Sequence, residues 1–246
     1  MIALLTDFGA ASHYTGQIKA VLRGVEVIDL CHDIPPGDVK AGAYVLLTSW
    51  HLFPEKTVFL AVVDPGVGTD RPAIAGSFNG YFFVGPDNGI FSPFIQKGAN
   101  LVRLPVPPHA SNTFHGRDLF APAAKALAMG ARLEDMGQPL ESPLVCQWFQ
   151  PRQTPQGIRA RVVLVDRFGN LITDVPGDML SGRRWAVMAG GKTVLPGKTY
   201  GDVEPGQAVA LVGSGGFLEI SIRDGNASGE LGLGVGDVVE VIWKTS

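Results

Sequence analysis

The pattern of apolar segments changes near residue 150 of this 246-residue chain, and no other feature constrains the fold as strongly. Before that point, short apolar runs alternate with stretches of helical periodicity, whereas only short strands separated by turn residues follow it. Strands that alternate with helices predict a mainly parallel sheet covered by helices. A series of short strands predicts a small antiparallel barrel. The chain is therefore predicted to be an α/β protein with a C-terminal antiparallel β-barrel domain.

The first, α/β domain is predicted to span residues 1–149. Asp38 is a suitable N-cap for its second helix, and Gly130 is a stop signal for its third. Asn79 and Gly80 form a two-residue hairpin signal between its last two strands. The expected strands are residues 2–5, 25–30, 57–63, 73–78 and 81–85, and the expected helices are residues 17–22, 39–50 and 119–129.

The second, barrel domain is predicted to span residues 157–246. The segment that leads into it, residues 150–157, is polar and contains two prolines and a glycine, which is typical of a linker. Residues 178–180 form the one helical turn expected in this domain. Its strands are expected over residues 158–165, 185–189, 192–195, 208–212, 218–222 and 238–242.

Composition disfavours several classes of function. Charged residues make up only 17% of the chain and the net charge is −3, which argues against a nucleic-acid-binding protein because such proteins need a basic face. Since no apolar stretch reaches about 18 residues, no membrane span is expected. The first residues also lack the pattern of a signal peptide. Cys31 and Cys146 are the only cysteines, an ordinary number for a reducing cytosol, so we expect a cytoplasmic protein.

Four loops are rich in Gly, Asp and Asn, and each directly follows a predicted strand. They are residues 6–9, 64–71, 85–89 and 166–170. Loops at the carboxyl ends of strands line the ligand crevice of an open parallel sheet, so we expect a binding site there. Each loop can also be an ordinary turn. The Asp-Phe-Gly in the first loop lacks the other kinase signatures, and the second loop lacks the Gly-Lys-Ser/Thr ending of a P-loop.

The five histidines give no evidence of a metal site. Their spacings contain no two-histidine zinc motif, and no Cys-x-x-Cys occurs, so no metal is expected. His115 is the most suggestive of them because it lies in a polar segment just before a predicted helix. The helix N-terminus disfavours the cationic form of such a histidine, which can then act as an acceptor or a base. A surface histidine that caps the helix is the alternative, and His51 is expected to be structural.

Seven motifs, in chain order, resemble those of the S-adenosyl-L-methionine (SAM) hydroxide adenosyltransferases, a family related to fluorinases and chlorinases. The motifs are residues 4–9, 28–35, 53–59, 62–69, 83–89, 114–118 and 166–171. The resemblance implies an enzyme that hydrolyses SAM to adenosine and L-methionine without a cofactor. It also implies a homotrimer in which SAM lies between the N-terminal domain of one subunit and the C-terminal domain of its neighbour.

The resemblance further implies catalytic roles for Asp64, Arg71 and His115. Because methionine is a good leaving group from a sulfonium, the enzyme needs only a nucleophile in line behind the C5′ carbon. Asp64 and His115 can hold a water molecule and accept its proton. Arg71 can stabilise hydroxide character and orient Asp64.

Substrate-binding residues follow from the same resemblance. The motif of Asp7 and Phe8 matches the family segment whose carboxylate grips the ribose hydroxyls. One position departs from the family, because Ser12 stands where relatives often have an Asp that can meet the methionine ammonium group. Affinity for that end of SAM is then reduced, or another group takes over the task. The C-terminal residues that match the family's binding segments are Asp166, Phe168, Asn170, Ser214, Phe217, Asn226 and Ala227.

Several of these positions have a plainer interpretation, and other functions remain open. Phe168 and Phe217 could be barrel core, and Asn226 could belong to a simple turn. A halogenase is disfavoured because those enzymes place a tyrosine where this chain has Asp64, whose carboxylate would repel halide. A catalytically silent adenosine-binding protein would not need the complete set of Asp64, Arg71 and His115. A purely structural trimer module would not need the polar loops.

Overall fold

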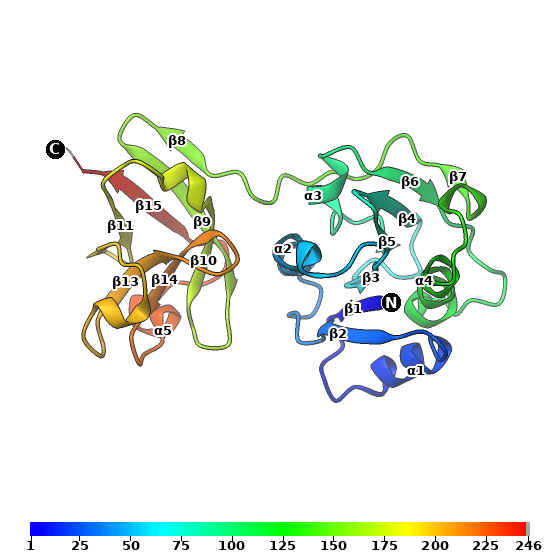
Figure 1. Cartoon of the computed structure of the whole chain (residues 1–246). Helices are drawn as coiled ribbons and strands as arrows, with labels where there is room; N and C mark the ends of the chain where they lie inside the picture. Colours follow the sequence, from blue (N-terminus) through cyan, green and yellow to red (C-terminus); the bar gives the residue numbers. More distant parts are fainter. Residues whose placement is uncertain (245–246) are drawn as a thin grey trace. The chain divides into compact units, whose positions relative to one another are not determined.

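The computed structural model describes residues 1–244 and divides the chain into two compact units, Met1–Cys146 and Gln147–Ser246 (Figure 1). The first unit is the α/β domain and the second is the barrel, so the predicted fold class is confirmed. Part of the predicted linker is regular, because β8 (Arg152–Thr154) pairs with β9 (Gly157–Val165). Within residues 1–244, no helix combines the length and apolar character needed to cross a membrane.

The first unit is built on a seven-stranded sheet of order β2-β1-β3-β5-β4-β6-β7. Neighbours are parallel from β2 to β5 and antiparallel from β5 to β7, so the sheet is mixed where a mainly parallel one was predicted. The change of direction arises at the hairpin, where Asn79 and Gly80 both have positive φ, at 48° and 82°. The strands are β1 (Ile2–Thr6), β2 (Val27–Cys31), β3 (Val58–Val62), β4 (Ala73–Phe78), β5 (Tyr81–Pro86), β6 (Asn100–Arg103) and β7 (Gln138–Pro139).

Helices cover both faces of this sheet (Figure 1). The alternate residues Ile2 and Leu4 of β1 pack in one core cluster with residues of α1 and α4, such as Ile18 and Leu127. On the opposite face, Gly42 of α2 lets that helix approach Ile90 closely. The helices are α1 (His13–Val21), α2 (Val39–Ser49), α3 (Ser92–Ile95) and α4 (Ala121–Ala128).

Two of the predicted helix signals are confirmed, whereas two helix starts are wrong, and the first of these helices, predicted from residue 17, begins at His13. Asp38 caps α2 by accepting from the amide of Ala41, and Gly130 follows α4 with a φ of 98°. The helix predicted to start at residue 119 starts at Ala121 instead. Residues 116–120 form a π-helical turn that precedes it, closed by the amide of Ala121 donating to the carbonyl of Gly116.

The second unit is an antiparallel barrel whose strand order is β12-β11-β15-β9-β10-β14-β13. Residues that follow β12 bridge to β13, since Gly197 N donates to Ala210 O and Ala210 N donates to Leu195 O. The sheet therefore nearly closes on itself, as predicted. A helical turn was predicted over residues 178–180 and is present at Gly177–Leu180, whereas β10 and α5 (Ala227–Leu231) were not predicted. The remaining strands are β10 (Leu171–Pro176), β11 (Trp185–Ala189), β12 (Lys192–Val194), β13 (Ala208–Val212), β14 (Phe217–Ile222) and β15 (Val238–Trp243).

Candidate active site

The first unit contains a cavity of about 500 Å³ beyond the carboxyl ends of β1 and β3. These strands are parallel neighbours, so the loops that follow them, residues 6–9 and 64–71, meet at the same edge of the sheet. The segment that ends at Gly116 completes the wall. Side chains that line the cavity include Asp7, Phe8, Tyr14, Asp64, Phe114 and His115. Two of the four predicted polar loops thus lie together at this cavity.

Asp64, Arg71 and His115, hereafter the triad, form one hydrogen-bonded unit. Arg71 Nε donates to Asp64 Oδ1 at 2.7 Å, and Nη2 donates to Oδ2 of the same carboxylate. Nη2 also lies 3.0 Å from Nδ1 of His115. The side chains of Asp64 and Arg71 are only 5% and 9% exposed, so this ion pair is shielded from solvent. Asp64 and His115 line the cavity, whereas Arg71 joins them from behind.

The loop that carries Asp64 and Arg71 folds back on itself. Val67 N donates to Asp64 O, and Thr69 N donates to Gly66 O, so the chain reverses within the loop. Gly68 makes this possible, because its φ is 78° and a Cβ atom there would lie 2.5 Å from the carbonyl oxygen of Asn112. The reversal returns Arg71 to Asp64 and presses the loop against the segment that leads to His115.

The segment around His115 is held on both sides. Asp118 accepts from Ser111 N at 3.0 Å and from Arg117 Nε at 2.6 Å. Arg117 also donates to Oε1 of Gln17 on α1, at 2.9 Å. The π-helical turn then begins immediately after His115. Such turns occur often at functional sites.

The geometry sets the charge and tautomer of His115. Because a guanidinium only donates hydrogen bonds, Nδ1 of His115 must be the acceptor, and the proton of the neutral ring is then on Nε2. Burial lowers the pKa of His115 and the charge of Arg71 lowers it further, against the opposing effects of Asp64 and Asp118. His115 is therefore a neutral side chain that presents an N–H donor.

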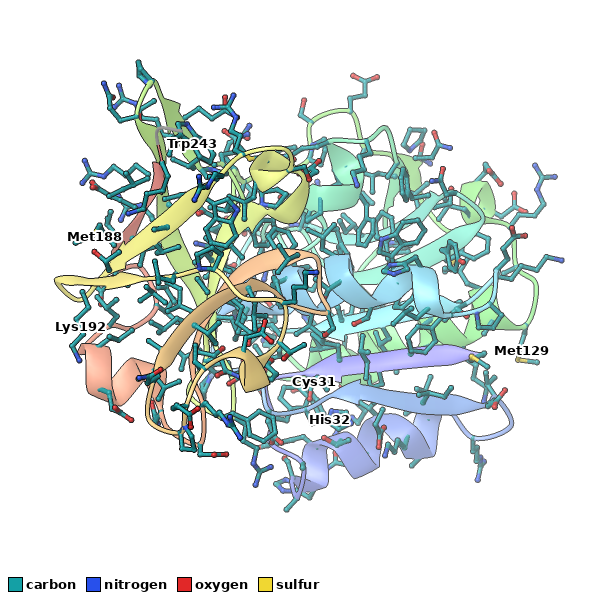
Figure 2. The ribbon with its side chains drawn as sticks, turned by 60° about the vertical axis from the view of Figure 1, so that its left-hand side comes forward. Cys31, His32, Met129, Met188, Lys192 and Trp243 are labelled. Carbon is teal, nitrogen blue, oxygen red and sulfur yellow. The ribbon has the colours of Figure 1, made fainter. Side chains whose placement is uncertain are left out.

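The loop with Asp7 is held by residues of the segment between β2 and α2. Oδ2 of Asp7 accepts from Gly37 N at 2.8 Å. The hydroxyl of Thr6 lies 2.9 Å from Nδ1 of His32, and the carbonyl of His32 accepts from Gly9 N at 2.8 Å. Figure 2 labels His32 at this position, beside Cys31. Sequence reasoning gave His32 no role, although it lies in one of the seven motifs.

Ser12 is occupied by a structural task. Its hydroxyl caps α1 by accepting from Tyr14 N at 3.3 Å, and it is not among the residues that line the cavity. Tyr14 lines the cavity instead and packs edge-on against Phe114 with ring centroids 5.1 Å apart. Phe8 contacts both rings, so three aromatic side chains form one wall. The sequence did not predict a role for Tyr14, because only the charge missing at position 12 was considered in that segment.

The loop of residues 85–89 has a structural role, which matches the second of the two alternatives given for each polar loop. Asp87 is buried and accepts from Leu144 N at 3.0 Å, and Asn88 Nδ2 donates to Val63 O at 2.8 Å. Neither side chain lines the cavity. Burial raises the pKa of Asp87, and the hydrogen bond from Leu144 opposes this effect only in part. Through this hydrogen bond, the loop holds the chain near residue 144 in place.

The second unit has a cavity of its own, of about 570 Å³, which Phe168 and Asn170 help to line. Oδ1 of Asp166 accepts from the amides of both residues at 2.9 Å, and Oδ2 accepts from Asn170 Nδ2 at 2.9 Å. Asp166 therefore shapes the loop and does not itself line the cavity. Phe168 is 76% exposed, which rules out its assignment as barrel core.

The other predicted C-terminal residues are not brought to this cavity. Ser214 is exposed in the turn between β13 and β14, whereas Phe217 and Ala227 are buried. Asn226 caps α5 by accepting from Gly229 N at 2.8 Å. Within this unit, Phe217, Asn226 and Ala227 have structural surroundings, whereas Ser214 is exposed.

Tyr200 lines the second cavity and was missed by sequence reasoning. Its hydroxyl donates to Oε1 of the buried Glu219 at 2.8 Å, and Ser221 Oγ donates to the same oxygen at 2.7 Å. Burial and the carboxylate of Glu219 together raise the pKa of Tyr200 to about 12. The signal in the sequence was the capping box that flanks the tyrosine, from Thr199 to Asp202.

Comparisons with known proteins give one family for the whole chain. Residues 2–137 match the model of the SAM hydroxide adenosyltransferase N-terminal domain, and residues 160–240 match that of the C-terminal domain. An (R)-S-adenosyl-L-methionine hydrolase of Thermus thermophilus is 39% identical over 98% of this chain and 99% of its own length. The crystal structure of an uncharacterized conserved protein from Thermotoga maritima is 37% identical, with a TM-score of 0.92, and covers 98% of this chain and 100% of that one. A fluorinase of Actinopolyspora mzabensis is more distant, at 26% identity over 90% of each chain.

Proposed function

The chain belongs to the SAM hydroxide adenosyltransferase family, and from that membership we propose that it hydrolyses SAM to adenosine and L-methionine. The observation that carries this proposal is the triad. Two of its members, Asp64 and His115, line a cavity large enough for a nucleoside, while the third links them from behind. Such an arrangement holds one acceptor and one donor at fixed positions beside a substrate.

The reaction is a displacement at the C5′ carbon. The oxygen of a water molecule forms the new bond to C5′, and the bond from C5′ to sulfur breaks with its electron pair moving to sulfur. The sulfonium becomes the neutral thioether of methionine, and the water loses one proton. Because the leaving group is already activated by its positive charge, the enzyme must mainly place and deprotonate the water. We therefore propose that no metal or cofactor takes part.

We propose different tasks for Asp64 and His115, in place of the shared role of proton acceptor that the resemblance implied. Nδ1 of His115 faces Arg71, so the ring can offer the nucleophile an N–H donor and no free lone pair. Asp64 is the carboxylate that can accept from the water and take its proton. Arg71 holds both side chains, and its charge favours hydroxide character in the water. Asp64 and His115 are thus the proposed catalytic residues, and Arg71 orients them.

Substrate binding is proposed to use both cavities. Asp7 and Phe8 line the first, where a carboxylate can accept from ribose hydroxyls. Phe168 and Asn170 line the second, where an exposed aromatic ring and an amide can meet the nucleoside. We propose a homotrimer in which neighbouring subunits each contribute one of these cavities to a site. The large exposed area of Phe168 supports a partner at that surface.

A cytoplasmic location is also proposed. Cys31 and Cys146 are both free thiols, which is the usual state of cysteines in a reducing compartment.

Purified protein incubated with SAM, in parallel samples without halide, with chloride and with fluoride, tests the function directly. Adenosine and methionine in every sample are the expected products. A 5′-haloadenosine would instead identify a halogenase. Binding of adenosine without turnover of SAM would identify a silent nucleoside-binding protein, and either outcome would overturn the proposed function.

A further inference from the structure

Phe120 lies directly behind the triad and belongs to no motif that the function has used. It is the last residue of the π-helical turn that begins after His115, and it is completely buried. The guanidinium carbon of Arg71 lies over its ring, 5.2 Å from the ring centroid. The ring of His115 meets the same phenyl ring edge-on, with centroids 6.4 Å apart and an angle of 85° between the ring planes. One side chain therefore contacts two members of the triad.

The donors of Arg71 explain why a contact on its face matters. Nε and Nη2 bind Asp64, Nη2 also reaches His115, and Nη1 donates to the carbonyl of Pro72 at 3.3 Å. All these hydrogen bonds lie in the guanidinium plane, because its five N–H groups lie there. These bonds are strongest when the acceptors lie in that plane, and they weaken as the plane tilts away from them. A contact perpendicular to the plane restricts that tilt.

The face of an aromatic ring supplies such a contact. It carries a negative quadrupole, which attracts a cation placed above it, and the attraction is stronger where water is excluded. Here the ring is fully buried and the Arg71 side chain is 9% exposed. The π-helical turn has a further consequence, because residues five positions apart, such as His115 and Phe120, lie on the same side of such a turn.

We propose that Phe120 is a positioning residue, whose ring face holds the guanidinium of Arg71 at the tilt that serves Asp64 and His115 together. The inference rests on the proposed function, because it concerns the side chains that act on water. Phe120 does not line the cavity, so its effect on catalysis passes through Arg71. Its loss should slow the chemical step and leave SAM binding almost unchanged.

Fluorination of the ring at position 120 separates this role from packing. Mono-, di- and trifluorophenylalanine keep the shape of phenylalanine nearly constant while they weaken the quadrupole step by step. We expect log kcat to fall in proportion to the loss of quadrupole, by roughly tenfold over the series, with KM unchanged. The matched control is the same series at Phe91, which is 1% exposed, packs on Phe83, and within residues 1–244 has no Arg or Lys over its ring.

The outcomes are distinguishable from one another. A graded fall in kcat at position 120, with a flat series at position 91, supports the proposal. Equal effects at both positions, or constant kcat at position 120 in an enzyme that hydrolyses SAM, would overturn it and leave the proposed function intact. Absence of SAM hydrolysis by the unsubstituted protein would overturn both. Phe120→Leu gives a second test, since a leucine fills most of the space without a ring face, and it should lose kcat at least as strongly as the trifluoro variant.

Discussion

The guanidinium of Arg71 donates to His115 at 3.0 Å while it holds the carboxylate of Asp64 through two further hydrogen bonds. Residues 44 positions apart in the sequence thereby become one unit. A single planar cation fixes both the acceptor and the donor that face the cavity, and this division of tasks can be tested residue by residue.

Arg71→Lys should reduce kcat roughly 100-fold while the protein stays folded. An ammonium group can neutralise Asp64, but it cannot make two parallel bonds to the carboxylate and also reach Nδ1 of His115. Steady-state kinetics with SAM, together with thermal unfolding, measures both effects. Arg71→Ala is the comparison, and it should destabilise the fold by about 3–5 kcal/mol because the Asp64 carboxylate is left buried without its partner. Parent activity in Arg71→Lys would contradict the role of the fork geometry.

The pKa of His115 should appear in the pH dependence of stability. It is lowered in the folded state, mainly by burial, so the unfolded chain binds the proton more tightly. The contribution of His115 to the free energy of unfolding is therefore greatest above its ordinary pKa of 6.5. It falls as the pH drops from there toward the pKa of the folded state. Denaturant unfolding measures the free energy of unfolding of the parent and of His115→Gln over this pH range. The slope of that free energy against pH should be shallower in the variant. Identical slopes would mean that His115 is not held neutral.

Asp87→Asn should leave kcat and KM for SAM unchanged, since Asp87 does not line the cavity. Burial raises the pKa of Asp87, so its charged form is disfavoured in the folded state and its contribution to stability falls as the pH rises through the folded pKa. The neutral amide keeps an acceptor for Leu144 N, and the variant should be at least as stable as the parent at pH 7. Asp87→Ala removes the acceptor and should cost about 1–3 kcal/mol. Loss of activity in Asp87→Asn would show that this loop contributes to the active site.

Gly68→Ala should lose both activity and stability. The new Cβ would lie 2.5 Å from Asn112 O, so the loop between Asp64 and Arg71 must move. Gly98→Ala is the matched control, because its φ of 91° is equally unfavourable but a Cβ there meets nothing within 4 Å. Both variants should lose about 1–2 kcal/mol to the positive φ, and Gly68→Ala should lose more. If both retain parent turnover, the reversal at Gly68 does not hold the triad in place.

Tyr200 should titrate near pH 12. Ultraviolet absorbance follows the four tyrosines of the chain as they ionise. Tyr200→Phe should remove the step near pH 12, and Glu219→Gln should move it to lower pH, because the negative charge that opposes ionisation is lost. A step near pH 12 that survives in Tyr200→Phe would assign the high pKa to another residue.

The sequence predicted the features that depend on local pattern. The hairpin at Asn79 and Gly80, the cap at Asp38 and the stop at Gly130 each depend on the conformational preference of one or two residues, and all three are present. The same holds for the alternation of strands and helices that placed the loops with Asp7 and Asp64 at one edge of the sheet.

Features that depend on distant contacts were missed. β10 was not recognised because it contains Thr173 and Asp174, and these polar residues are buried only because each has a distant partner, such as Arg161 N for Asp174. The loop with Asp87 has the composition of a binding loop, but Leu144, 57 positions later, determines its role. The π-helical turn adds one residue to a helical pattern, which no periodicity argument would show.

In the proposed reaction, water attacks the C5′ carbon of SAM under the control of Asp64. The most direct measurement is mass spectrometry of the products formed in ¹⁸O-labelled water by the parent and by Asp64→Asn. Adenosine carrying one ¹⁸O atom beside unlabelled methionine, with turnover nearly abolished in Asp64→Asn, is the predicted result. Unlabelled adenosine, or labelled adenosine formed by Asp64→Asn at the parent rate, would contradict it.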